Sequence, residues 1–453
     1  MKTTKLFFMA ALALMTAACS NDDNDLTQQP AKAEGIPFTA TISLDQSATT
    51  RALTENGTTI EATWATGEKV ALIYTVSATT YVKEAEVTPQ GDGTATISTT
   101  LEGSPADDTD VTIVYPASAV DGTTKDVKTN LLASQNGLLT GTGSIAEKYE
   151  LRKTTTPAKL KIDGTTASLK GTVSLSNQNA IFKLTLKDIE GTSDVSATSV
   201  VISDQTGVVT TVTPASGYEN AMYVALPTTA TTLKFLVTGS DSKKYFNMAS
   251  SLTLSASYYQ STVKLATVGD VILSTGKCAK AGTSGAVAKI CYLGNDAETS
   301  PTNTAFKNGL ALALEDVSGT KTWCSQTSAT CLGTGHQFNY EADAKGDMAG
   351  IDNTDYLINH APDGHTHAAA SAARNYNSTH PAGTSAWFLP SAGQWDKMID
   401  AAGLSNLDLQ ESAYYWSSTE RNARRVWYLI SSNGYCDYNP RDRDYLVRAC
   451  LAF

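Results

Sequence analysis

The stretch AIFKLTLKDI, residues 180–189, alternates apolar and polar side chains along its length. In an extended chain, Phe182, Leu184 and Leu186 point to one side, and the lysines and threonine between them point to the other. A period of two is typical of a β-strand that has one face in a protein core. The stretch therefore predicts a half-buried β-strand.

Runs of the same kind recur throughout residues 36–265 and are separated by Gly, Asp, Asn and Pro. The others are FTATISL (38–44), KVALIYTV (69–76), ATISTTL (95–101), VTIVYPA (111–117), AKLKI (158–162), ATSVVISD (197–204), AMYVALP (221–227), TLKFLVTG (232–239) and QSTVKLATV (260–268). Helical periodicity is nearly absent from this part of the chain. The pattern predicts a mainly β fold, with two antiparallel β-sandwich domains at residues 36–150 and 151–268.

The N-terminus reads MKTTKLFFMAALALMTAACS, with Lys2 and Lys5 before an apolar run at residues 6–15. This run is too short to span a bilayer, and it predicts a signal peptide at residues 1–18. The residues before Cys19 resemble the lipobox of bacterial lipoproteins. The resemblance implies lipidation of Cys19, with palmitate among the attached groups, an outer-membrane anchor and a tether at residues 19–35. An ordinary secretory signal with a chance cysteine is the alternative.

The acidic residues that follow Cys19 resemble the surface-export signal of Bacteroidetes lipoproteins. The formal net charge of −11 argues against nucleic acid as a partner. No other segment approaches eighteen consecutive apolar residues, so we expect a protein anchored to the membrane and not one that spans it. No cofactor is predicted.

Six cysteines lie in the C-terminal part of the chain, and none lies between Cys19 and the first of them. An even number in an exported protein predicts disulfides. The candidates are Cys278, Cys291, Cys324, Cys331, Cys436 and Cys450. Fifteen pairings are possible for six cysteines, and the short spacings favour pairing between nearest neighbours. Zinc binding through cysteine is the weaker alternative, because no CxxC motif is present.

Three motifs follow the N-terminal segment in order: TTRA at 49–52, ATWATGEKVALIY at 62–74 and IVYPA at 113–117. With them the chain resembles the fimbrillin family of Bacteroidetes pilins over about residues 35–268. The resemblance implies two tandem transthyretin-like β-sandwich domains. It also implies proteolytic processing at Arg51, loss of the first strand, and capture of a strand from other fimbrial subunits by donor-strand exchange. A solvated loop arginine is the alternative for Arg51.

Residues 269–453 differ in composition from the preceding part of the chain. They hold five of the six tryptophans, all five histidines and six of the seven cysteines. Their motifs are WFLPS (387–391), Gln394-Trp395, YWSSTE (415–420), Trp427, and Val447-Arg448 through Ala452-Phe453. In this order they resemble the C-type lectin-like domains of bacterial surface proteins, including the Fibrobacter major-paralogue group. The resemblance implies an α+β domain whose tryptophans belong to the framework.

The loop SNGYCDYNPRDRD, residues 432–444, combines aromatic, amide and charged groups between two predicted strands. Such a mixture suits a glycan or protein surface, although a solvated, self-paired loop is the alternative. The candidate ligand-binding residues are Tyr435, Asp437, Tyr438, Asn439, Arg441, Asp442, Arg443 and Asp444.

No metal site is predicted, and the weak candidates are His360, His365 and His367, with an exposed polar loop as the alternative. No phosphate-binding loop or nucleophile elbow occurs, so we predict that the protein is not an enzyme. An enzyme of the formylglycine-generating type stays open as a remote alternative. It would need a free reactive thiol.

The sequence therefore predicts an adhesive fimbrial subunit at the cell surface with a host or microbial glycan or protein ligand. The closing VRACLAF, residues 447–453, is expected inside the C-terminal sheet, which leaves no strand to donate and favours a place at the fimbrial tip. A monomeric surface glycan-binding lipoprotein outside any pilus is the alternative.

Overall fold

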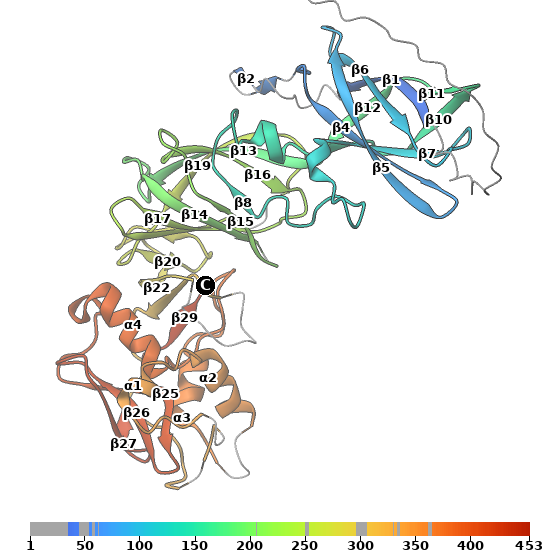
Figure 1. Ribbon diagram of the computed structural model, residues 1–453. Helices are drawn as coiled ribbons and strands as arrows, with labels where there is room; N and C mark the ends of the chain where they lie inside the picture. The colour runs from blue at the N-terminus through green and yellow to red at the C-terminus, as the bar shows by residue number, and fades with distance from the viewer. Residues whose placement is uncertain are drawn as a thin grey trace, which may run out of the picture.

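The computed structural model of the protein describes residues 35–44, 54–56, 59–61, 63–204, 206–249, 253–295, 306–328, 330–332, 336–360 and 365–453. Its fold is mainly β, which confirms the predicted class. Figure 1 shows three groups of elements in chain order: an N-terminal sheet, a central pair of sheets, and a C-terminal unit of strands and helices. The predicted lipidation site Cys19 and processing site Arg51 lie outside the described residues.

The N-terminal sheet has nine strands. They are β1 (Ile36–Leu44), β4 (Lys69–Val76), β5 (Thr79–Pro89), β6 (Thr94–Leu101), β7 (Asp110–Tyr115), β9 (Arg152–Lys153), β10 (Ala158–Asp163), β11 (Thr166–Leu169) and β12 (Val173–Asn177). Their spatial order is β10-β11-β1-β12-β9-β7-β4-β5-β6, and β1 also pairs with β6 while β10 pairs with β7. The sheet thus closes on itself like a barrel, around a core of alternate apolar residues. A small hairpin, β2 (Thr54–Asn56) and β3 (Thr59–Glu61), and a short helix η1 (Ala117–Ala119) accompany it.

Two of the motifs that follow the N-terminal segment meet inside this sheet. The ring of Trp64 packs edge-on against Tyr115, with 5.4 Å between centroids. The hydroxyl of Tyr115 donates to Oε1 of the buried Glu68 at 3.2 Å, and the backbone N–H of Ala65 donates to Oε2 at 3.0 Å. The motifs at 62–74 and 113–117 are therefore parts of one buried structural cluster.

The central unit has two facing sheets. Its strands are β8 (Ser134–Gln135), β13 (Asn179–Asp188), β14 (Ala197–Asp204), β15 (Gly207–Val212), β16 (Ala221–Pro227), β17 (Leu233–Gly239), β18 (Lys244–Ala249) and β19 (Tyr258–Leu265). One sheet has the order β16-β13-β19 and the other β18-β17-β14-β15-β8. Phe182 and Leu184 of β13 are buried against Val200 and Ile202 of the opposite sheet, as in a β-sandwich. The alternating stretch 180–189 is thus a half-buried strand, as predicted.

The sheets do not divide at residue 150, where the sequence analysis placed the boundary. Strands β9 to β12 follow that position but belong to the N-terminal sheet. Conversely, β8 precedes it but pairs with β15 of the central unit, and the short π-helix η2 (Ile145–Tyr149) packs on Ile181. The chain therefore crosses between the two units more than once. A period-two pattern identifies strands but does not reveal such long-range partners.

In the described residues, the C-terminal unit combines three sheets with four α-helices and one short 3-10 helix. The strands are β20 (Val271–Leu273), β21 (Cys278–Ala279), β22 (Ala286–Leu293), β23 (Gly309–Ala313), β24 (Lys321–Thr322), β25 (Tyr414–Asn422), β26 (Arg425–Ile430), β27 (Cys436–Pro440), β28 (Asp444–Tyr445) and β29 (Cys450–Ala452). The helices are α1 (Glu341–Ala344), α2 (Gly350–Asn359), α3 (Ala368–Arg374), α4 (Ala392–Ala402) and the short η3 (Leu404–Asn406). The sheets have the orders β21-β20-β22-β23-β29, β24-β28 and β25-β26-β27.

Helix α4 begins directly after the Leu-Pro-Ser segment of the WFLPS motif. The hydroxyl of Ser391 accepts from the backbone N–H of Gln394 at 3.2 Å, and the Gln394 side chain accepts from the backbone N–H of Ser391 at 3.0 Å. This capping box satisfies two backbone donors that a helix N-terminus would otherwise leave open. Gly403, with a φ of 78°, ends the helix.

The five tryptophans of this unit are buried, and for Trp387, Trp395, Trp416 and Trp427 this is the core position that was predicted. Each indole N–H donates to a backbone carbonyl. The acceptors are Ser417 for Trp323, Thr379 for Trp387, Trp416 for Trp395, Lys321 for Trp416 and Phe338 for Trp427. The rings therefore fix loop backbones as well as filling the core.

The central and C-terminal units share one apolar core. Phe246 of β18 packs on Phe453 with 4.7 Å between ring centroids. Strand β29 pairs with β23 inside the C-terminal sheet, as predicted for the VRACLAF segment. Figure 1 accordingly shows the end of the chain, marked C, at the junction of the two units.

Candidate functional site

The predicted ligand loop, residues 432–444, leads from β26 through β27 to β28. Five of its eight candidate residues are exposed, namely Tyr435, Asp437, Asp442, Arg443 and Asp444. Tyr435 has the largest exposed ring of the loop, at 63%. These five side chains are accessible to a partner, and Asp437 also accepts the Tyr428 hydroxyl at 3.3 Å. The remaining three are half-buried or buried.

Tyr438 and Asn439 are half-buried in this hairpin. The guanidinium carbon of Arg421 lies 3.9 Å from the centroid of the Tyr438 ring, and that of Arg425 lies 5.2 Å from it. The amide of Asn439 donates to the hydroxyl of Tyr445 at 2.6 Å. Stacked cations and a shared hydrogen bond hold these two side chains in place.

The prediction that Arg441 binds a ligand is wrong, because its side chain is completely buried. Its Nη2 donates to Oε1 of Glu420 at 2.7 Å and to the backbone carbonyl of Asn422 at 2.9 Å. Its own carbonyl accepts the backbone N–H of Trp323 at 2.9 Å. Arg441 therefore cannot face a ligand at the surface and instead organises the interior of the unit.

Glu420 is the last residue of the YWSSTE motif and the partner of Arg441 in this buried ion pair. Its carboxylate also accepts the backbone N–H groups of Cys331 and Leu332, each at 3.2 Å. The positive charge of Arg441 and the backbone N–H donors together stabilise the Glu420 carboxylate, which burial alone would strongly destabilise. The motif thus fixes the position of Cys331.

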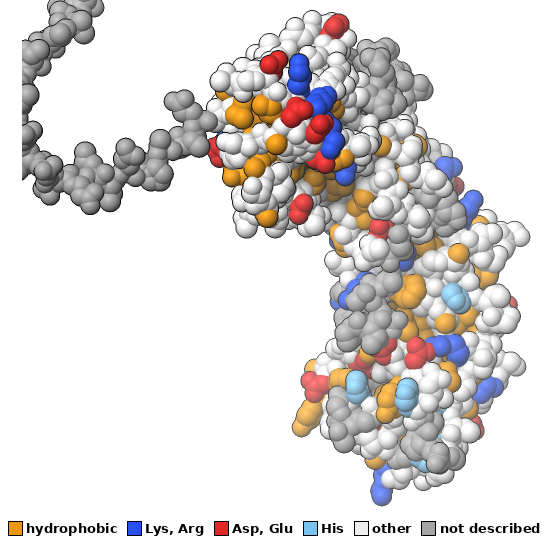
Figure 2. Space-filling view, turned by 90° about the vertical axis from the view of Figure 1, so that its right-hand side faces the viewer, with side chains coloured by type: hydrophobic (Ala, Val, Ile, Leu, Met, Phe, Trp, Pro, Cys, Tyr) orange, Lys and Arg blue, Asp and Glu red, His pale blue; other side chains and the backbone are white. Residues whose placement is uncertain are grey.

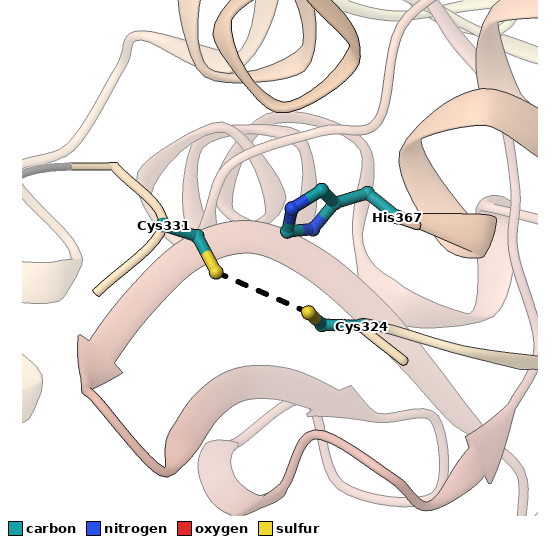
Figure 3. Close-up of side chains that lie close together, drawn as sticks. All are labelled: Cys324, Cys331 and His367. Carbon is teal, nitrogen blue, oxygen red and sulfur yellow. Dashed lines mark hydrogen bonds between the residues drawn. The ribbon is translucent and has the colours of Figure 1, made fainter. Parts of the chain in front are cut away.

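Cys324, Cys331 and His367 come together beside this ion pair. The ligand-capable atoms of the three side chains all lie within 4.8 Å of one another, and all three residues are buried. Figure 3 shows that the side chains converge from three separate segments, with the two sulfur atoms facing each other at 4.0 Å. This is the only such group of His, Cys, Asp or Glu side chains among the residues that the structure describes.

Backbone contacts hold the segments of Cys324 and His367 together. The backbone N–H of Ser325 donates to the carbonyl of Thr366 at 2.9 Å, and the N–H of Thr366 donates to Oγ of Ser325 at 2.9 Å. The His367 ring meets Trp323 edge-on at 5.2 Å between centroids. Ser325 and Thr366, the chain neighbours of Cys324 and His367, therefore hold these two candidate ligands close together.

The two thiols of this group have opposed acidities. Hydrogen bonding from Cys331, assisted by the nearby His367, lowers the pKa of Cys324. The same shared hydrogen bond, together with burial, raises the pKa of Cys331. Cys324 is therefore the more acidic of the two thiols.

The other predicted metal candidates lie apart from this group. His360 ends α2 and stacks on Tyr356 at 4.8 Å between centroids. It lines a pocket of about 470 Å³ together with residues that include His336, Asp352 and Asp355. His365 is half-buried, and its Nδ1 has no hydrogen-bond partner. Histidine and acidic side chains lie beside one another on one face of the C-terminal unit (Figure 2).

The structure describes the six cysteines as thiols, and the predicted disulfides stay predictions. The sulfur atoms of Cys324 and Cys331 lie 4.0 Å apart, whereas the S–S bond of a disulfide is about 2.05 Å long. Burial raises the pKa of Cys278, Cys291 and Cys436, each to about 12. Burial therefore favours the protonated form of these three thiols.

A second buried network surrounds Asp347, which was not predicted as a site residue. Its Oδ2 accepts the Thr419 hydroxyl at 2.7 Å and the Asn353 amide at 3.0 Å, and its Oδ1 accepts the Ala349 N–H at 3.0 Å. Burial nevertheless raises the pKa of Asp347. The network connects α2 to β25 and supports the framework.

No protein-family model matches the chain, and no curated protein matches it. Among solved structures, a fimbrial protein from Bacteroides ovatus is similar, with 15% identity and a TM-score of 0.30, over 93% of this chain and 99% of that one. A candidate cell adhesion protein from Bacteroides uniformis has 16% identity and a TM-score of 0.30, over 52% of this chain and 97% of that one. A second candidate cell adhesion protein, from Bacteroides ovatus, has 12% identity and a TM-score of 0.31, over 51% of this chain and 95% of that one.

Similarity at this level does not assign a function to the chain. None of these comparisons addresses the predicted C-type lectin-like identity of the C-terminal unit. Within the described part of the chain, no helix has the length and apolar character that a membrane crossing requires.

Proposed function

We propose that the protein is an adhesive subunit of a cell-surface fimbrium and that it is lipid-anchored through Cys19. We also propose that the subunit exchanges its first strand for a strand from another subunit. The observation that carries this proposal is the place of β1. It pairs with β6 along its length, from Ile36 opposite Leu101 to Ser43 opposite Thr94. On its other edge it pairs in parallel with β11 and β12. An N-terminal strand thus completes the sheet between strands that come much later in the chain.

Removal of β1 would open a groove in the N-terminal sheet. Phe38 and Ile42 are buried by 99% or more, and their loss would expose the core around Leu72, Ile97 and Leu160. It would also leave the facing backbone groups of β6, β11 and β12 without partners. A strand of similar alternation from another subunit would restore both kinds of interaction.

Processing at Arg51 would separate β1 from the strands that follow it. Arg51 lies in the chain between β1, which ends at Leu44, and β2, which begins at Thr54, so its segment is the covalent connection from β1 to the later strands. A cut there would turn β1 into a peptide held by non-covalent contacts alone.

The C-terminal unit supplies the adhesive surface in this proposal, and we propose binding, not catalysis, as its role. The exposed residues of the 432–444 loop, with Tyr435 foremost, offer a ring and charged groups to a glycan or protein ligand. Strand β29 is paired within its own sheet and is not available as a donor, which supports a place at the fimbrial tip.

Strand exchange can be tested on the full purified chain. An arginine-specific protease is applied, and the cut protein is mixed with a synthetic peptide of residues 36–44 and, separately, with a stalk pilin. We expect capture of the peptide and of the pilin, detected by native mass spectrometry, and no capture by Arg51→Ala. A peptide with Phe38→Asp and Ile42→Asp is the matched control. If the wild-type chain is cut but captures neither partner, strand exchange is excluded and a monomeric surface protein is favoured.

A further inference from the structure

We propose that Cys324, Cys331 and His367 form a binding site for a Zn²⁺ ion. The three residues come from different segments, are buried, and present two sulfur atoms and an imidazole to one point (Figure 3). Sulfur and imidazole nitrogen are the ligands that zinc prefers in proteins. This inference does not depend on the adhesive role proposed above.

The distance between the sulfurs fits a shared ion better than a bond between them. With Zn–S bonds of about 2.3 Å, two sulfurs on a tetrahedral ion lie about 3.8 Å apart. The observed Sγ–Sγ distance is 4.0 Å. A disulfide would require the two atoms to approach by nearly half that separation.

The His367 ring provides a second, independent observation. It is 2% exposed, and neither Nδ1 nor Nε2 has a hydrogen-bond partner. An imidazole that is buried with both ring nitrogens unsatisfied destabilises the folded protein. A metal ion would occupy one nitrogen, whereas a disulfide between the cysteines would leave both as they are.

The groups around the sulfur atoms are those that support thiolate ligands. Arg441 donates from Nη1 to Sγ of Cys331 at 3.0 Å, and the backbone N–H of Gln326 donates to Sγ of Cys324 at 3.4 Å. Hydrogen bonds to ligating atoms hold them in position and tune the site. Arg441 is itself held by Glu420, so a supporting layer is already in place.

The charges in this interior favour a divalent ion. Two thiolates and the Glu420 carboxylate carry three negative charges, and Arg441 carries one positive charge. Zn²⁺ brings the sum to zero, and a monovalent ion would leave one negative charge in a buried site. Binding releases the thiol protons to solvent, so the step balances without an oxidant.

The ion would connect three parts of the C-terminal unit: the segment after β24, the segment that holds Cys331, and the start of α3. No fourth His, Cys, Asp or Glu side chain joins the group among the described residues. A three-ligand site leaves one coordination position for a small ligand.

The test uses the full chain, expressed and purified with zinc present and without reductant. Bound zinc is measured by elemental mass spectrometry, and cobalt substitution is followed by absorption. We expect about one zinc per chain and a thiolate-to-cobalt charge-transfer band. Cobalt absorption by the unmodified chain needs no variant, so the test holds even where a variant fails to fold.

Cys324→Ser and His367→Gln should abolish stoichiometric zinc and the cobalt band, and Arg441→Lys should weaken zinc affinity by roughly 10–100-fold. Cys436→Ser and His380→Gln, each outside the group, are the matched controls and should retain zinc. A Cys324–Cys331 disulfide in the zinc-grown protein, absence of bound zinc, or equal loss of zinc in the controls would overturn the proposal.

Discussion

Arg441 donates to Glu420 over 2.7 Å, and the side chains of both residues are completely buried. The pair joins the end of β25 to the turn before β28, and its atoms also reach Cys331 and Trp323. An ion pair without solvent is sensitive to the loss of either partner, because the remaining charge has no compensation.

Arg441→Met is therefore expected to lower the free energy of unfolding of the C-terminal unit by about 3–5 kcal/mol. Chemical denaturation, followed by tryptophan fluorescence in the presence of a chelator, separates this effect from any metal. Arg443→Met, two residues away and exposed, should change stability by less than about 0.5 kcal/mol.

The double variant Arg441→Met with Glu420→Gln should recover part of the lost stability, because it removes the uncompensated charge. Equal stability of the Arg441 and Arg443 variants would contradict the structural role given to this pair.

Phe38→Ala tests the contribution of β1 to the N-terminal sheet. The ring is 1% exposed in the core of that sheet, so its truncation should cost about 3–5 kcal/mol. Thr39→Ala changes the neighbouring exposed residue on the same strand and should cost less than about 1 kcal/mol. Thermal unfolding of both variants measures the difference, and similar melting temperatures would show that β1 is not part of the stable sheet.

The strands were predictable because each carries its own evidence in an alternating pattern. Phe182 and Leu184 show their buried face without reference to the rest of the chain. The capping box of Ser391 and Gln394 at the start of α4 is an equally local feature, formed by residues three apart. Features determined within a few residues could therefore be obtained from the sequence alone.

Long-range partners could not be obtained in this way. Strands β9 to β12 pair across the predicted boundary, because registry depends on residues far away in the chain. Cys324 and Cys331 lie more than thirty residues from His367, so the cysteines and histidines form separate motifs in the sequence. The sequence signal for this group was the pair of cysteines with six residues between them, together with the His-Thr-His segment at 365–367.

Tyr435→Ala tests the proposed ligand surface. The ring is 63% exposed and contributes little to the core, so the variant should fold with unchanged stability. If the ring is an anchor for the ligand, binding should weaken by roughly tenfold or more. The measurement is retention on a glycan array or on a captured protein ligand. Tyr340→Ala, which removes a 74% exposed ring outside this loop, is the matched control, and equal loss in both variants would exclude the loop.

Lys234 gives a prediction for the pH dependence of stability. It lies in β17 opposite Met248 and is 7% exposed, with its ammonium 5.3 Å from the Phe306 ring centroid. Burial lowers its pKa from 10.5 to about 8. Between these two values the unfolded chain holds a proton that the folded chain has released, so stability should rise with pH across this window.

Lys234→Met should remove this dependence and raise stability at pH 7 by up to about 3 kcal/mol, since each pKa unit corresponds to about 1.4 kcal/mol. Buried thiols and tyrosines also titrate at high pH, so the quantity to measure is the difference between variant and wild type. That difference should be largest below pH 8 and vanish above pH 10.5, the ordinary lysine value. Lys277→Met, at an exposed position, should give a flat difference near zero. A flat curve for Lys234→Met as well would mean that this lysine stays charged in the folded protein.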